Sequence, residues 1–264
     1  MAPSGFGSLA ARSPTIISGR RDDPPGAIVR PTDTDGRVVM VSGANRGIGA
    51  AIAERLAADG HRLSLGARRL DALAASAPGV DPDRILLSYH EATDPDSARR
   101  WVEATVNRFG GIDVLVNSAG IVDRTGLESM DENVLDEMWE VNVKGPLRLT
   151  RLALPHLRLS GSGRVINLAS MSAKRVKGDA LPGYSMTKYA LLALSHAVRQ
   201  VGWDDGIRVT ALCPGPVATD MMDPDDETIT QPEDVADLVA TVIELPNTAS
   251  VSELLITCRL EAWA

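Results

Sequence analysis

Two side chains able to move a proton lie four residues apart in the segment Tyr184-Ser185-Met186-Thr187-Lys188. An apolar run follows at residues 189–194, so the pattern predicts a helix in which Tyr184 and Lys188 share one face. An ammonium group beside a phenol favours the phenolate, which predicts a Tyr184 pKa below the usual value of about 10. A phenol adjusted in this way exchanges a proton with a substrate oxygen. The alternative is an ordinary amphipathic helix with a half-exposed tyrosine and a solvated lysine.

The elements that would position this pair begin with a strand, a glycine-rich turn and a helix. Residues 37–41 are apolar and β-branched, which predicts a buried strand, and residues 42–49 read SGANRGIG. Glycine lets the backbone approach a pyrophosphate closely, and the N-terminus of the following helix offers free N–H groups to it. In this context the turn predicts a nucleotide-binding loop, whereas a glycine-rich loop alone also fits a plain tight turn. Alternating strands and helices around such a loop predict an α/β fold with a doubly wound parallel sheet in three αβα layers.

Bulk composition bounds the class of protein. The 264 residues carry a formal net charge of -8, which argues against binding to nucleic acid or anionic membranes. No apolar run approaches the roughly 20 residues that cross a bilayer, and the two cysteines, Cys213 and Cys258, predict buried thiols in a reducing cytoplasm. Residues 1–36 are rich in Pro, Gly and Ser without a sustained period, which predicts a flexible extension ahead of one folded domain at 37–264.

The glycine spacing is specific. Gly43, Gly47 and Gly49 form G-x-x-x-G-x-G, which resembles the glycine motif of the short-chain dehydrogenase/reductase family, with Ser42 in place of the usual threonine. Further segments resemble that family's motifs in the same order, namely NSAG at 117–120, the helical Asn142, the strand-end Ser170, the Tyr184/Lys188 pair and the PG at 214–215. The resemblance covers about residues 37–257.

This resemblance implies hydride transfer between a nicotinamide and the carbon of a carbonyl or secondary alcohol. Tyr184 would be the general acid and base, Ser170 would hydrogen-bond the reacting oxygen, and Lys188 would hold the nicotinamide ribose. Asn142 would hold a water behind Lys188. Ser172 is the second choice for the serine, because the 14-residue gap from Ser170 to Tyr184 exceeds the family's commonest spacing by one.

The end of the second predicted strand, residues 62–67, bears on the cofactor. An acidic residue there would bind a ribose 2′-hydroxyl and favour NAD, but Ala67 stands at that place and Arg68 follows. A guanidinium suits a 2′-phosphate, and Arg46 could reach the same group, so NADP is predicted, with NAD as the alternative. The candidate cofactor-binding residues are Gly43, Asn45, Arg46, Gly47, Ile48, Gly49, Arg68, Glu91, Ala92, Asn117, Ala119, Gly120, Tyr184, Lys188, Pro214, Gly215, Val217 and Thr219.

Two later segments carry further expectations. A helix predicted over 131–159 contains Asn142 and Gly145, both unfavourable inside a helix, which predicts a break there. Residues 220–231 are short and acidic, and the resemblance implies that they correspond to the family's substrate-covering loop. The four histidines lack metal-ligand spacing, so no metal is predicted.

The predicted partner is a small carbonyl or alcohol substrate, and the resemblance implies a homodimer or homotetramer. Two other functions stay open. One is a non-catalytic NADP(H)-binding sensor or regulatory protein on the same sheet. The other is a methyltransferase with a glycine-rich first turn, for which the Tyr184/Lys188 pair has no use.

Overall fold

The structure is a computed structural model that describes residues 36–75, 80–176, 179 and 181–261. The predicted extension at 1–36 lies outside the described residues except for Gly36, and so stays a prediction. Seven strands form one sheet in the order β3-β2-β1-β4-β5-β6-β7, and every neighbouring pair is parallel. The strands are β1 Val38–Ser42, β2 Arg62–Ala67, β3 Ile85–Tyr89, β4 Val114–Asn117, β5 Arg164–Leu168, β6 Arg208–Pro214 and β7 Glu253–Ile256.

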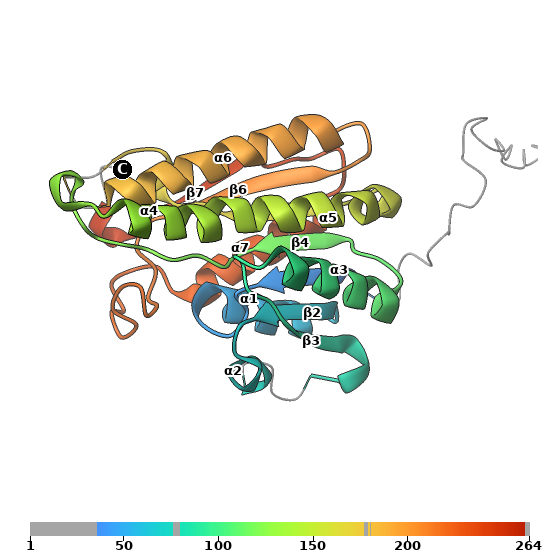
Figure 1. The fold of residues 1–264 in the computed structure, drawn as a ribbon. Coiled ribbons are helices and arrows are strands. Elements are labelled where there is room, and N and C mark those ends of the chain that lie inside the picture. Colours follow the sequence, from blue (N-terminus) through green and yellow to red (C-terminus); the bar gives the residue numbers. More distant parts are fainter. Residues whose placement is uncertain (1–35, 76–79, 177–178, 180, 262–264) are drawn as a thin grey trace, which may run out of the picture. The chain divides into compact units, whose positions relative to one another are not determined.

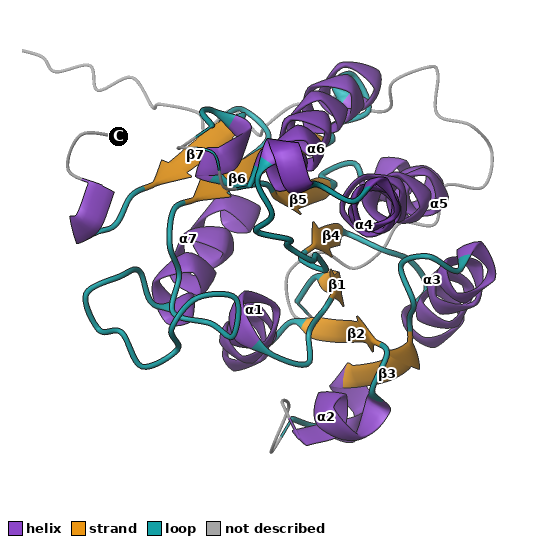
Figure 2. Cartoon of the chain, turned by 60° about the vertical axis from the view of Figure 1, so that its left-hand side comes forward, coloured by secondary structure: helices purple, strands orange, loops and turns teal. Residues whose placement is uncertain are grey.

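The strand order runs outward in both directions from β1 and β4, so the sheet is doubly wound, as predicted, in a single domain. Figure 2 views the sheet nearly along its strands, with α1 and α7 on one side and α3, α5 and α6 on the other. The helices are α1 Gly47–Ala58, α2 Leu70–Ala75, α3 Pro95–Phe109, α4 Glu132–Trp139, α5 Gly145–Ser160, α6 Pro182–Gly202 and α7 Pro232–Glu244. Short 3-10 turns are η1 Pro82–Arg84, η2 Leu127–Ser129, η4 Met171–Ala173 and η5 Arg259–Glu261.

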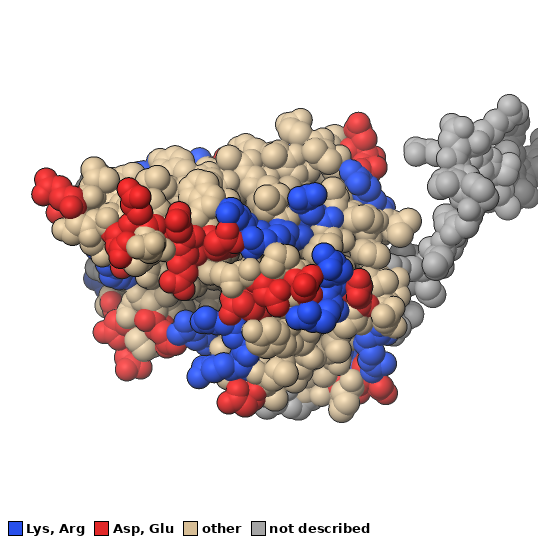
Figure 3. Space-filling model, in the orientation of Figure 1, with Lys and Arg blue, Asp and Glu red and all other residues tan. Residues whose placement is uncertain are grey.

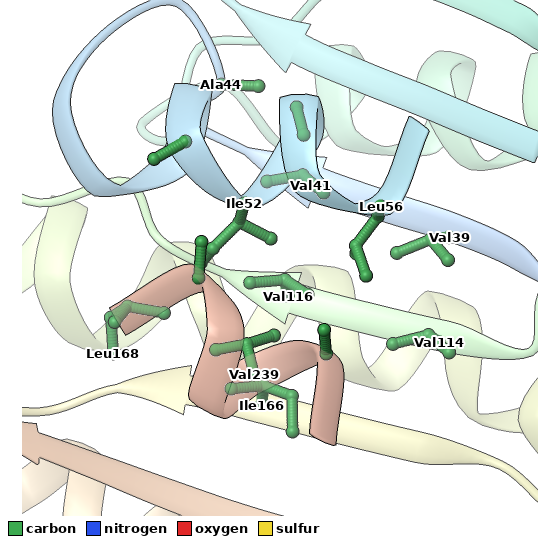
Figure 4. Packing of buried hydrophobic residues seen from close by; sticks show 14 of the residues in the cluster. Val39, Val41, Ala44, Ile52, Leu56, Val114, Val116, Ile166, Leu168 and Val239 are labelled. Atoms are coloured by element: carbon green, nitrogen blue, oxygen red, sulfur yellow. The ribbon is translucent and has the colours of Figure 1, made fainter. Parts of the chain in front are cut away.

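Each face of the sheet is covered by its own hydrophobic cluster. On one side Ile52 and Leu56 of α1 point toward Val39 and Val116 of the sheet, with no exposed surface on any of the four (Figure 4). Burying such a side chain stabilises the fold by about 1.5–3 kcal/mol. The strands are therefore apolar on both faces, which is why they read as continuous apolar runs in the sequence.

The predicted break in the long helix is confirmed. Residues 131–159 fold as α4, a π-helical segment η3 at Glu140–Lys144, and α5, which begins at Gly145. The three pieces follow one another along α6 (Figure 1). Asn142 lies inside the π segment with no exposed surface. Such π bulges are frequent at functional sites.

Candidate active site

A cavity of about 860 Å³ opens beyond the carboxyl ends of the central strands. Its wall is formed by the glycine turn, the residues after β4, the first turn of α6 and the segment after β6. All of the predicted cofactor-binding residues line it except Asn117, and so do Ser170 and Ser172. Because ligands of doubly wound sheets bind where the strand order reverses, this is the expected place for a dinucleotide.

The glycine turn could not be built from other residues. Gly43 and Gly47 have φ angles of 69° and 52°, in the left-handed region that L side chains rarely adopt. A Cβ atom on Gly49 would lie 2.3 Å from the carbonyl oxygen of Gly43. The N-terminus of α1 has no side-chain cap and no acid in its first turn, so its N–H groups and positive dipole end are open to an anion. These features fit the pyrophosphate of a dinucleotide.

Ser42 shows what the hydroxyl at the start of this motif does. Its Oγ accepts hydrogen bonds from the N–H groups of Ser118 (3.1 Å) and Ala119 (3.3 Å). The hydroxyl thereby ties the end of β1 to the chain leaving β4. The two segments are close enough that a Cβ on Gly43 would meet Ala119 Cα at 2.9 Å.

Asn117 was predicted to contact the cofactor, but the structure places it behind the cavity wall. Its side chain is buried, and its Nδ2 donates to Asn167 Oδ1 at 2.8 Å. The next residue, Ser118, lines the cavity instead. The reason is the alternation of side chains along β4, which turns residue 117 into the protein interior.

The predicted phosphate-binding arginines both line the cavity and both face an acid. Arg46 Nη1 lies 2.7 Å from Asp220 Oδ2, and Arg68 Nε lies 3.7 Å from Glu91 Oε2. More than half of each arginine side chain is exposed, so these ion pairs are weak. Either guanidinium is therefore free to exchange its carboxylate for a phosphate.

His90 also lines this end of the cavity, as the first residue of the segment 90–94, which resembles the family's adenine-contacting stretch. Its ring lies 4.9 Å from the Trp101 ring, and burial lowers its pKa to about 4, so the imidazole is neutral. Within the described residues its Nε2 has no hydrogen-bond partner. The sequence signal for this residue is its place in that segment, directly after β3 and beside the predicted contact Glu91.

The predicted catalytic side chains converge at the other end. Tyr184 stands in the first turn of α6, and the Ser170 side chain is close enough to act on its pKa. Ser170 Oγ also accepts the Ser172 N–H at 3.0 Å, which fixes its rotamer. Lys188 Nζ donates to the Leu168 carbonyl at 2.7 Å and lies 5.4 Å from the centre of the Tyr184 ring.

The predicted direction of the Tyr184 pKa is wrong for this structure. Burial raises the pKa to about 12, although the Ser170 hydrogen bond and the Arg124 charge both act to lower it. Burial likewise lowers the pKa of Lys188 to about 8. The cost of desolvating each charged form therefore outweighs the attraction that the i,i+4 spacing was expected to supply.

Asn142 does not line the cavity. Its amide bonds the backbone of Ile121 and donates to the Thr187 hydroxyl at 3.0 Å. Thr187 in turn donates to the carbonyl of Tyr184 at 2.8 Å. Asn142 thus links the cavity loop after β4 to the turn that carries Tyr184.

Three charged residues of the cavity wall carry no motif. Arg124 follows β4, Arg175 follows β5, and Glu261 comes from η5 near the end of the chain. Arg175 Nη2 lies 2.6 Å from Glu261 Oε1, and the Glu261 side chain is 5% exposed. The Glu261 carboxylate occupies the space where a side chain of residue 215 would stand, because a Cβ on Gly215 would lie 1.8 Å from Oε2.

Comparison with known proteins identifies the scaffold. The family described as short chain dehydrogenase matches residues 37–230. This chain belongs to the short-chain dehydrogenase/reductase family. Its scaffold is therefore that of the NAD(P)-dependent dehydrogenases and reductases of this family.

Individual family members resemble it along most of its length. Agropine synthesis reductase of Rhizobium rhizogenes is 44% identical over 230 residues, which are 85% of this chain but 53% of that protein. The chain thus spans about half of that relative. An alcohol dehydrogenase of the archaeon Thermococcus sibiricus, solved with 5-hydroxy-NADP, is 30% identical with a TM-score of 0.77 and covers 83% of this chain and 95% of its own. A short-chain dehydrogenase of Burkholderia cenocepacia, solved with NADP, is 29% identical with a TM-score of 0.78, over 84% of this chain and 96% of its own.

The residues that the structure describes contain no group of three or more His, Cys, Asp or Glu residues that could hold a metal ion. Among the helices of the described part of the chain, none has the length and apolar character of a membrane span.

Proposed function

We propose that this protein transfers hydride between NADP(H) and the carbon of a carbonyl, or of the matching secondary alcohol, in a small organic substrate. The observation that carries the proposal is the shared cavity, because Tyr184, Ser170 and Lys188 line the same space as the glycine cradle. When bound there, the nicotinamide supplies or accepts the hydride.

The side chains of this chain would handle the proton. In reduction, Tyr184 donates its phenolic proton to the substrate oxygen as negative charge develops on it. The Ser170 hydroxyl donates a hydrogen bond to the same oxygen. Burial keeps Tyr184 protonated at neutral pH, which is the form that reduction needs. In oxidation Tyr184 must act as a base, and a positive charge placed beside it would lower its pKa.

Lys188 and Asn142 would support this chemistry by binding the cofactor ribose and by positioning the turn that carries Tyr184. The Leu168 carbonyl orients the Lys188 ammonium at the cavity wall, where it can bind ribose hydroxyls. Asn142 holds the loop at Ile121 against the Thr187 turn and so positions the first turn of α6.

Two observations support NADP over NAD. Arg46 and Arg68 line the cavity at the end of β2, where Ala67 offers no carboxylate to a ribose 2′-hydroxyl. The relatives from Thermococcus sibiricus and Burkholderia cenocepacia were solved with 5-hydroxy-NADP and NADP. The relative named as a reductase supports reduction as the working direction.

We also propose that the protein forms a homodimer or homotetramer. Helices α5 and α6 expose large apolar side chains, which a second copy could cover. They are Leu147, Leu159, Met186, Tyr189 and Val201. Light scattering after size-exclusion chromatography would measure a mass of two or four chains, and a monomer would contradict the proposal.

The function is tested by Tyr184→Phe, which removes one oxygen from the buried pair. We expect turnover of a ketone and alcohol panel to fall at least 1000-fold, while NADPH affinity, measured by fluorescence titration, stays within about threefold. Tyr189→Phe is the matched control, because Tyr189 is exposed on the same helix and should keep full activity. If Tyr184→Phe were as active as the native protein, the proposed catalytic role would be wrong, and a non-catalytic nucleotide-binding sensor would be the better explanation of the site.

A further inference from the structure

The cavity is positively charged although the chain as a whole is acidic. On the face shown in Figure 3, acidic side chains gather over α4 and over the segment that follows β6. The described residues lining the cavity nevertheless include more cations than acids. The cations are Arg46, Arg68, Arg69, Arg124, Arg175 and Lys188, and the acids are Glu91, Glu137, Asp220 and Glu261.

Most of these cations already contact an acid or a carbonyl group of the chain. Arg46, Arg68 and Arg175 each lie within 4 Å of an acid of the wall. Arg69 stands beside Arg68 at the end of β2, and Lys188 is buried against the Leu168 carbonyl. Like Arg69, Arg124 has no carboxylate within salt-bridge distance in the described structure, but it stands on the loop after β4, away from the end of β2.

The structure holds Arg124 in place with neutral groups. Its Nη2 donates to the Met221 carbonyl at 2.6 Å and contacts the Met222 sulfur at 3.1 Å. Its backbone is fixed as well, since the Asp123 carboxylate accepts the Thr125 N–H at 2.9 Å. Nη1 and Nε make no hydrogen bond within the described residues, so the guanidinium keeps unused donors for a ligand.

Arg124 belongs to the catalytic end of the cavity. Its charge acts on the hydroxyl of Tyr184 to lower the pKa of that group. The loop that carries it runs from Gly120 through Ile121, which the amide of Asn142 clamps. Arg175 lies on the same wall, but its charge is neutralised by Glu261. A substrate anion would therefore meet an unpaired positive charge at Arg124 and an ion pair at Arg175.

We propose that Arg124 binds a carboxylate of the substrate and that the protein prefers oxo acids and hydroxy acids over neutral ketones and alcohols. A guanidinium presents parallel N–H donors that match a carboxylate, and a pair of this kind selects firmly between an acid and its ester. This inference rests on the proposed function and names the substrate class of the same site.

The experiment compares acids with their methyl esters. Pyruvate, acetoacetate and levulinate place the carboxylate at increasing distances from the carbonyl, and each has a neutral methyl ester. Each compound is assayed with saturating NADPH, using the native protein, Arg124→Gln, Arg124→Lys and the control Arg151→Gln, an exposed residue of α5 outside the cavity wall.

For the native protein we expect kcat/KM to be at least tenfold higher for one acid than for its ester. Arg124→Gln should lower that value at least 30-fold, mainly through KM, and should lower the value for the ester far less. Arg124→Lys should fall between, and Arg151→Gln should match the native protein. Equal rates for acid and ester, or an equal loss on both in Arg124→Gln, would overturn the inference, because Arg124 would then only anchor Met221.

A binding measurement separates this inference from the proposed function. Calorimetric titration of the NADP-saturated protein with lactate and 3-hydroxybutyrate should show binding that weakens at least tenfold in Arg124→Gln and is absent for the methyl esters. Absence of carboxylate binding to the native protein would overturn the inference. Turnover of the esters would still uphold the oxidoreductase, and carboxylate binding without any turnover would overturn the proposed function alone.

Discussion

The amide of Asn142 makes two hydrogen bonds to one residue: its Nδ2 donates to the Ile121 carbonyl and its Oδ1 accepts the Ile121 N–H, both at 2.9 Å. The pairing satisfies both backbone groups of Ile121 at the point where the chain turns into the cavity. It depends on the π-helical segment, which carries Asn142 on the buried side between α4 and α5.

Asn142→Ala should therefore destabilise the fold as well as slow the reaction. Losing these bonds in a fully buried position should cost about 2–4 kcal/mol, because the Ile121 groups lose their partners. Urea unfolding measures this loss, with Asn133→Ala on the exposed face of α4 as the control. A change below about 0.5 kcal/mol would show that water replaces the amide.

Lys188→Met should change how stability depends on pH. The folded-state pKa of Lys188 is about 8, below its ordinary value of 10.5, so above pH 8 the unfolded state holds the extra proton. Native stability therefore rises through this window, and that rise is absent from the variant. Between pH 7 and 9.5 the free energy of unfolding should rise by about 2 kcal/mol more in the native protein than in Lys188→Met. Unfolding curves at the two pH values test this, and parallel behaviour would mean an unshifted lysine.

The contact between Gly215 and Glu261 predicts a non-additive pair of substitutions. Gly215→Ala should destabilise by about 1–3 kcal/mol, because its new methyl group must displace the Glu261 carboxylate. In a Glu261→Ala background the same change should cost much less, since the space is then empty. A double-mutant cycle of thermal unfolding gives the coupling. Additive effects would show that Glu261 does not occupy this place in solution.

Arg68→Asp should turn cofactor preference toward NADH. The new carboxylate repels a 2′-phosphate and can accept a hydrogen bond from a 2′-hydroxyl. We expect the ratio of kcat/KM for NADPH to that for NADH to fall at least tenfold. Arg99→Asp, on the exposed face of α3, should leave the ratio unchanged. An unchanged ratio in Arg68→Asp would mean that other groups select the cofactor.

Local sequence patterns were sufficient for the fold and for most of the cavity wall. The glycine turn and the strand-end residues could be predicted because each depends on neighbours a few positions away, as Gly43 and Gly49 do. The helix break at Asn142 followed from propensity alone.

The remaining features depend on burial and on contacts between distant segments. The Tyr184 pKa follows from how deeply α6 packs its first turn, which the i,i+4 spacing does not encode. The side chain of Asn117 lies outside the cavity wall because the family motif indicates the segment and not the side of the strand to which each residue points. Glu261 reaches Arg175 only because β7 adds at the edge beside β6, so no pattern near residue 261 marks it.

The ion pair between Arg46 and Asp220 places a carboxylate of the chain itself on the cavity wall. A carboxylate from the segment after β6 already sits on a guanidinium that the coenzyme would need, so arrival of the phosphate is an exchange of anions and not a simple addition. Part of the coenzyme's attraction would thereby be cancelled in advance, and Asp220 would leave Arg46 while Arg124 still holds the neighbouring Met221 carbonyl. Binding of the coenzyme phosphate to Arg46 and separation of Asp220 from Arg46 would then be two parts of one equilibrium.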